Sequence, residues 1–112
     1  MTKTLLATAA MALALAVPAY ASDNVQHDLL MRKSPAEQNA ILAIAAASAG
    51  YACKVRRHTF KGLYKGDAYH LAECTNGSAY LITLPADPNG EVIVLDCEIA
   101  AAVGADCFAV WD

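Results

Sequence analysis

Four cysteines constrain the fold of this 112-residue chain more than any other feature of its sequence. They are Cys53, Cys74, Cys97 and Cys107, an even number that all lie after residue 50. Their spacings match neither the C-x-x-C of a redox pair nor the ligand spacing of a zinc finger. Such a set in a small exported chain is typical of structural disulfides. Four cysteines allow three connectivities, and sequence alone leaves all three open.

The first residues have the anatomy of a secretory signal peptide. Lys3 supplies a positive start, residues 5–17 form an apolar run, and residues 19–21 (Ala-Tyr-Ala) are a small-x-small cleavage signal. The run is too short to cross the hydrocarbon core of a membrane as a helix. We therefore expect cleavage after Ala21 and a soluble periplasmic or secreted product, with no membrane span after cleavage.

Charge is unevenly distributed along the rest of the chain. Residues 22–65 carry seven basic and three acidic groups, whereas residues 66–112 carry eight acidic groups and no Lys or Arg. The stretch KVRRHTFKGLYK, residues 54–65, alone holds five of the eight Lys and Arg residues. The acidic balance argues against nucleic acid as the main partner. A length of about 90 residues suits one domain, which we place at residues 34–112.

The stretch SPAEQNAILAIAAASAG, residues 34–50, predicts a helix with both ends marked. Ser34 and Glu37 form an S-x-x-E capping box, and Pro35 suits the first helical position. Gly50 suits the left-handed residue that follows a last turn. The interior is mostly Ala, so this smooth helix can lie close to a sheet. Residues 22–33 are polar, and we expect a mobile N-terminal segment there.

After Gly50 the pattern alternates between apolar and polar residues, with turn signals between the runs. Strands are predicted at residues 51–60, 67–74, 78–84 and 91–97, with a loop at 85–90 and a short helix at 98–104. Asn76-Gly77 predicts a two-residue hairpin turn, because both residues tolerate a positive φ. The predicted fold class is α+β: an N-terminal Ala-rich helix packed on a four-stranded antiparallel meander, then a short C-terminal helix and tail, with two disulfides.

The pairing of the first two predicted strands favours one disulfide connectivity. A hairpin that turns at residues 61–66 places Cys53 opposite Cys74 and Lys54 opposite Glu73, a favourable cross-strand charge pair. Directly opposed Cα atoms lie within disulfide reach. We therefore favour Cys53–Cys74, which leaves the other two cysteines, Cys97 and Cys107, to pair across the short helix.

The same register divides the predicted sheet into two faces. A small apolar face suits the Ala-rich helix; its members are Cys53, Val55, Ala72, Cys74, Ala79, Leu81, Val92 and Val94. The opposite face is the candidate binding face, whose members are Lys54, Arg56, His58, Tyr69 and Tyr80, beside Leu71, Glu73, Ile82, Ile93 and Leu95. Its cations have two interpretations. They are either outward charges that keep an edge strand from aggregating, or a site for an anionic ligand or an acidic protein.

No catalytic or metal-binding pattern stands out in the sequence. No Ser-His-Asp grouping exceeds what chance provides, and the cysteines are assigned to disulfides. A metal site would need the histidines to meet in the fold. His58 and His70 fall on opposite faces of the predicted hairpin, so we expect no metal site, and likewise no cofactor and no catalytic residue.

Residues 36–97 resemble the PepSY-type pattern, in which a helix ending in Gly-Tyr precedes a strand meander with an x-D/N-G-x-x-Y hairpin. They also resemble small exported bacterial proteins of unknown function that share a C-x-N/D-G-x-x-Y hairpin followed by two further cysteines. The matching positions are Gly50, Tyr51, Cys74, Asn76, Gly77, Tyr80, Cys97 and Cys107. The resemblance implies an α+β module of the cell envelope, and PepSY domains are associated with peptidase inhibition or regulation. The four cysteines depart from the usual PepSY pattern.

Together these features predict a non-enzymatic, disulfide-stapled periplasmic module that binds a protein or an anionic component of the cell envelope. A peptidase inhibitor or regulator of the PepSY type is the alternative, implied by the resemblance. A small hydrolase is the second alternative.

Overall fold

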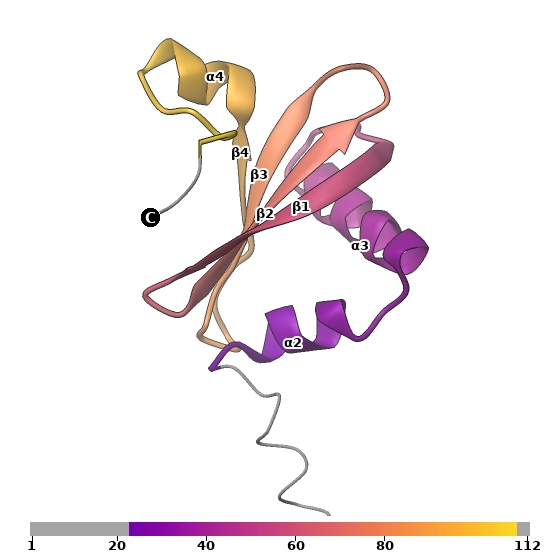
Figure 1. Cartoon of the computed structure of the whole chain (residues 1–112), viewed down its shortest axis with the longest axis vertical. Coiled ribbons are helices and arrows are strands. Elements are labelled where there is room, and N and C mark those ends of the chain that lie inside the picture. Colours follow the sequence, from indigo (N-terminus) through magenta and orange to yellow (C-terminus); the bar gives the residue numbers. More distant parts are fainter. Residues whose placement is uncertain (1–22, 110–112) are drawn as a thin grey trace, which may run out of the picture.

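The chain forms a four-stranded antiparallel sheet with helices on both sides (Figure 1). The computed structural model describes residues 23–109, so the expected signal peptide lies outside the described residues. The elements are α2 (Val25–Met31), α3 (Pro35–Ser48), β1 (Val55–Tyr64), β2 (Asp67–Cys74), β3 (Ala79–Leu84), β4 (Ile93–Asp96) and α4 (Cys97–Ala102). The strand order β1-β2-β3-β4 is that of a meander. The predicted fold class is confirmed.

Helix α3 begins and ends where its sequence predicts. The Ser34 hydroxyl accepts a hydrogen bond from the Glu37 amide at 3.2 Å, and a Glu37 carboxylate oxygen accepts one from the Ser34 amide at 3.1 Å. At the other end Gly50 has a φ of +94°. The Tyr51 amide donates back to the Ala46 carbonyl at 2.9 Å, which completes a Schellman motif. Local capping chemistry therefore fixes both ends of this helix.

Helix α2 corrects the expectation that residues 22–33 are a mobile segment. Asn24 caps the helix by accepting a hydrogen bond from the His27 amide at 2.9 Å. Its side-chain amide also donates to the carbonyls of Gly66 and Leu84, at 3.1 and 2.7 Å. Leu30 is 4% exposed and belongs to the core. These contacts join residues far apart in the sequence, which is why a local pattern did not reveal them.

The first hairpin has a different register from the predicted one. Its loop is the two-residue turn Lys65-Gly66, with φ values of +54° and +86°, so β1 runs on to Tyr64. Consequently Arg57, not Lys54, pairs with Glu73. Irregularities between Val55 and Arg57 and between Phe60 and Gly62 shift the register within the strand. Lys65 lacks the usual preference for a positive φ, which is why the sequence placed the turn too early.

The second hairpin turns at Asn76-Gly77 as predicted, but its loop is longer than two residues. The Gly77 amide donates to the Cys74 carbonyl at 3.0 Å, and the Cys74 amide donates to the Ser78 carbonyl at 2.8 Å. Within this loop only Gly77 has a positive φ, of +92°. This is a three-residue loop that ends in a left-handed glycine.

The extra loop residue reverses the predicted facing of β3. Ala72 pairs with Tyr80 instead of Leu81. Tyr80 and Ile82 therefore lie on the side of the sheet that α2 and α3 cover, which we call the α3 side. Ala79 and Leu81, predicted for that side, lie instead on the opposite side, which we call the α4 side.

Two separate hydrophobic cores result, one on each side of the sheet. The α3-side core is made of Leu30, Leu42, Ala68, Ala72, Cys74, Tyr80, Ile82 and Leu84. The α4-side core is smaller and is made of Leu71, Leu81, Cys97, Ala100 and Cys107. Helices α2 and α3 cover one side of the sheet, and the single short helix α4 packs near β4 on the other (Figure 1).

Both predicted disulfides are present, one in each core. Cys53–Cys74 has a Cα–Cα distance of 5.3 Å and ties the chain ahead of β1 to the end of β2. Cys97–Cys107 has a Cα–Cα distance of 5.7 Å and ties the start of α4 to the segment that follows it. No described cysteine is free.

Candidate functional site

The five residues of the predicted binding face do not share one face. Tyr80 is 7% exposed and lies on the α3 side, where the centroid of its ring is 4.7 Å from the ring centroid of Tyr51. His58 lies on the same side, with Nδ1 3.4 Å from Oδ1 of Asn39 on α3. Lys54 lines a shallow hollow of about 350 Å³ beside the alanines of α3.

The other two predicted residues, Arg56 and Tyr69, lie on the α4 side of the sheet. Tyr69 packs against the α4-side core, and burial raises the pKa of its hydroxyl. Arg56 reaches Glu73, whose strand neighbour Ala79 packs against the same core. The predicted face therefore divides between the two sides of the sheet.

The strongest charged grouping on the α4 side is an arginine pair, Arg56 and Arg57, held by one carboxylate. Arg57 Nε donates to Oε2 of Glu73 at 2.8 Å, and Arg56 Nη2 donates to Oε1 at 3.5 Å. The Glu73 side chain is 14% exposed, whereas those of Arg56 and Arg57 are 56% and 64% exposed. Hydrogen bonding to Glu73 raises the pKa of Arg57. Two outward cations thus share one partly buried anion.

A β-bulge explains why two consecutive residues reach the same carboxylate. Side chains normally alternate between the faces of a strand, so neighbours point apart. The register shift between Val55 and Arg57 inserts one extra residue, and a bulge of this kind re-aims a side chain. The basic stretch extends to Lys61, whose ammonium donates to the Phe108 carbonyl at 3.2 Å. The outcome is a basic edge strand facing solvent on the α4 side.

The structure also brings together three histidines that the sequence placed apart. Nδ1 of His27 lies 3.0 Å from Nε2 of His70, and the His58 and His70 ring centroids are 5.3 Å apart. Phe60 stacks on His27 with a centroid distance of 4.4 Å. The expectation that His58 and His70 lie on opposite faces is wrong. Phe60 pairs with His70 in the observed register, so the even-numbered residues of both strands face α2 and α3 there.

Burial disfavours the charged form of all three histidines. His70 is fully buried, and the loss of hydration, followed by repulsion from His27 and His58, lowers its pKa to about 3. Burial lowers the pKa of His58 as well. It also lowers that of His27, partly offset by the nearby Asp28 carboxylate.

The His27–His70 contact needs one proton between its two nitrogens, and Nδ1 of His70 is buried without a partner. If His70 donates from Nε2, its orphaned Nδ1 is a lone pair, which is less costly than an unpaired N–H. Within residues 23–109, no group of three or more His, Cys, Asp and Glu side chains could hold a metal ion. The His27–His70 contact therefore joins α2 to β2 inside the α3 side of the molecule.

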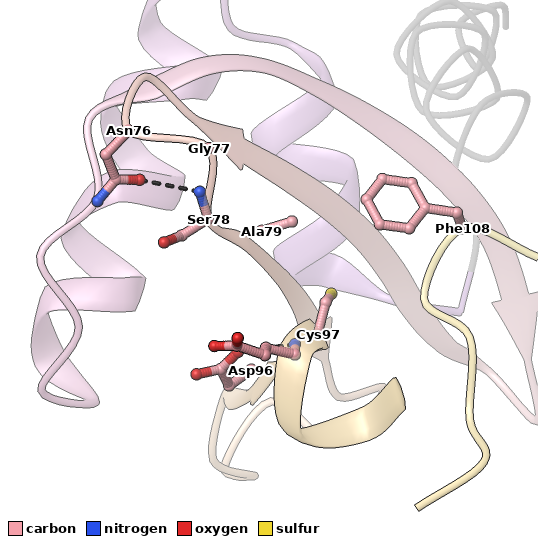
Figure 2. A pocket seen from close by; sticks show the side chains of 8 residues that line it. Asn76, Gly77, Ser78, Ala79, Asp96, Cys97 and Phe108 are labelled. Carbon is pink, nitrogen blue, oxygen red and sulfur yellow. Dashed lines mark hydrogen bonds between the residues drawn. The ribbon is translucent and has the colours of Figure 1, made fainter. Parts of the chain in front are cut away.

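A polar hollow of about 480 Å³ lies between the β2–β3 loop and the start of α4 (Figure 2). Its polar side chains serve local turns: Asn76 Oδ1 accepts from the Ser78 amide and Asp96 Oδ1 from the Glu98 amide, both at 2.9 Å. The exposed Phe108 side chain forms part of its wall. The sequence pattern identified Asn76 and Gly77 as a turn, but it did not place Asp96 or Phe108 beside them, because these residues come from separate parts of the chain.

Comparisons with protein-family models, with curated proteins and with solved structures find no match to this chain. Of the helices described, none has the length and apolar character needed to cross a membrane.

Proposed function

We propose that this chain is a non-enzymatic, disulfide-stapled exported module that binds an anionic partner, either a protein or an envelope component, through strand β1. The arginine pair, Arg56 and Arg57, carries the proposal. The bulge directs both side chains to one side of the sheet, and Glu73 holds both guanidiniums while more than half of each side chain stays exposed. Guanidinium groups are well suited to carboxylates and phosphates, which they bind with directed hydrogen bonds.

The position of β1 adds support to this site. It is an edge strand, so only one of its sides pairs with another strand of the sheet. Lys61 lies further along the same strand and extends the positive charge. His58 and Tyr80 face α3 and take no part in the site. The proposed surface is thus narrower than the predicted face and consists of Arg56, Arg57 and Lys61.

The absence of enzymatic chemistry and the periplasmic location are part of the proposal. All four cysteines form disulfides, so none supplies a nucleophilic thiolate. Two disulfides in a small domain fit an oxidising compartment such as the periplasm. His70 is fully buried, which removes it from contact with any substrate.

The test is a double charge reversal, Arg56→Glu with Arg57→Glu, measured by pull-down from envelope extract and by binding to an acidic peptide at low and high salt. We expect binding at low salt that is lost in the variant and weakened by salt, because exposed charge contacts are screened. The matched control is Arg32→Glu with Lys54→Glu, which changes the net charge equally at residues that form no ion pair with Glu73. The proposal would be contradicted if both variants lost binding equally, or if binding were the same at low and high salt.

A second candidate, peptidase regulation, is favoured by the length and exposure of the same edge. A ten-residue edge strand offers an extended backbone, and extended segments are what strand-pairing partners bind. The PepSY resemblance points the same way. Incubation of the purified protein with periplasmic peptidases of its host should change a cleavage rate, and unchanged rates for all of them would exclude this candidate.

A further inference from the structure

A groove of about 280 Å³ lies on the α3 side of the molecule, between α2 and α3 (the two purple helices of Figure 1). Its floor is made of Leu30, Leu42 and Leu84, which are 4%, 1% and 7% exposed. Its rim is made of Leu29, Ile41 and Val92, which are 52%, 39% and 38% exposed. The groove is thus an apolar hollow that opens to solvent between partly exposed aliphatic side chains.

One charged side chain, that of Lys33, lines this groove. Arg32 precedes it in the sequence, so the positive charge is concentrated at the turn between α2 and α3. Glu37 is the acid that interacts with Lys33, and one oxygen of its carboxylate, Oε1, accepts hydrogen bonds from the amide and the hydroxyl of Ser34. An occupant with an apolar body and one negative group would match both the lining and its charge.

We propose that this groove binds the acyl chain of a single-chain anionic amphiphile, such as a fatty-acid carboxylate, with the head group on the Lys33 ammonium. This site is separate from the β1 surface, and its existence does not depend on the proposed function. The groove volume lies just below the range of about 300–1,000 Å³ for drug-sized ligands, which suits one flexible chain better than a ring system. The apolar walls give water few hydrogen-bond partners, so an alkyl chain displaces it favourably.

The test is calorimetric titration of the purified protein with octanoate, decanoate and dodecanoate below their micelle concentrations. Each added methylene that enters the groove should tighten binding roughly fourfold, about 0.8 kcal/mol. Decyltrimethylammonium has the same chain with a positive head, and we expect it to bind at least tenfold more weakly than decanoate. Lys33→Glu should reverse that order while it keeps the dependence on chain length.

A matched pair of variants on α3 locates the site. Ile41→Asp places a carboxylate at the groove rim and should abolish decanoate binding. Ile44→Asp makes the same change one turn along the helix, at a side chain that is 66% exposed and outside the groove, and should leave binding unchanged. Thermal unfolding followed by circular dichroism checks that both variants are folded.

Several outcomes would overturn the proposal. These are no binding of any of the three carboxylates, an affinity that does not change with chain length, or equal loss in both α3 variants. Loss of decanoate binding in the Arg56→Glu, Arg57→Glu variant would assign the ligand to β1 instead. Self-association that Ile41→Asp abolishes, without carboxylate binding, would assign the groove to a second copy of the chain.

Discussion

Arg57 and Glu73 face each other across β1 and β2, with Nε and Oε2 2.8 Å apart, and Arg56 contacts the same carboxylate. Because the bulge brings two guanidiniums to one acceptor, Glu73 stabilises an arrangement that would otherwise repel itself. The carboxylate is mostly covered while both cations remain outside. Glu73 thus has a positioning role on this surface.

Replacing Glu73 should therefore lower stability in a salt-dependent way. In Glu73→Gln the two guanidiniums lose their shared anion, and their mutual repulsion is greatest at low ionic strength. We expect urea denaturation at low salt to show a small decrease in the free energy of unfolding. This decrease should largely disappear at high salt. Glu91→Gln removes an exposed acid from the loop before β4 and is the control. A loss that does not change with salt would show that Glu73 acts through packing instead of charge.

Acid should destabilise the protein through the histidine cluster. The pKa of His70 is lowered from 6.5 to about 3 in the folded chain. Below pH 6.5 the unfolded chain therefore binds more protons than the folded one, and stability falls as pH falls. From pH 7.5 to pH 5 the contribution of His70 is a loss of about 2 kcal/mol in the free energy of unfolding. The lowered pKa values of His27 and His58 act in the same direction.

The measurement is urea denaturation across this pH range for the parent chain and for His70→Phe. The variant removes the buried titrating ring, so its stability should change less between the two pH values. Hydrogen exchange should show that α2 loosens first, since His27 is its link to the cluster. An identical pH dependence in parent and variant would contradict the assignment to His70.

The turn at Lys65-Gly66 offers a stabilising substitution. Lys65 has a φ of +54°, a conformation that Asn adopts more readily than Lys, and Asn-Gly is the preferred pair for such a two-residue loop. We expect Lys65→Asn to raise the free energy of unfolding by about 0.5 kcal/mol. Gly66→Ala should lower it, because Gly66 has a φ of +86° and a Cβ there would lie 3.1 Å from that of Ala86. Thermal denaturation of both variants checks the two signs, and a Lys65→Asn variant less stable than the parent would contradict the reasoning.

Features governed by local chemistry could be predicted from the sequence. The helix caps at Ser34 and Gly50 depend on neighbours within a few positions, and both were confirmed. The disulfide pairing was confirmed although the register that suggested it was wrong. Cys74 pairs with Val55 in the sheet, yet its Cα still lies 5.3 Å from that of Cys53. The disulfide can form even though the strand register differs by two residues from the predicted one. The prediction of which side chains lie on each face of the sheet depends on the exact register, and it was wrong.

Two kinds of feature could not be predicted from the sequence. The first depends on a one-residue change in strand register, and the second depends on contacts between residues far apart in the chain. One extra residue in the Asn76-Gly77 loop moved Tyr80 from the predicted binding face into the α3-side core. The bulge beside Arg56 likewise created an arginine pair that strict alternation forbids. Helix α2 and the histidine cluster depend on contacts such as Asn24 with Leu84, 60 positions apart, which no local pattern reveals.

The second disulfide should control how firmly α4 covers the sheet. Cys97 and Cys107 are both buried in the α4-side core with Leu71 and Leu81, so the bridge closes that core. In the loop-entropy description a bridge of this span contributes about 3 kcal/mol. Cys97→Ser with Cys107→Ser should therefore lower global stability and speed amide exchange mainly in α4 and β4.

The first disulfide provides the matched comparison. Cys53→Ser with Cys74→Ser opens the α3-side core. Amide hydrogen exchange should then become faster at the start of β1 and at the end of β2, with little change in α4. Local opening of this kind is expected when two cores lie on opposite sides of one sheet and each has its own covalent tie. If loss of either bridge speeds exchange equally throughout residues 23–109, the two cores unfold as one unit and the separation argued from their packing is wrong.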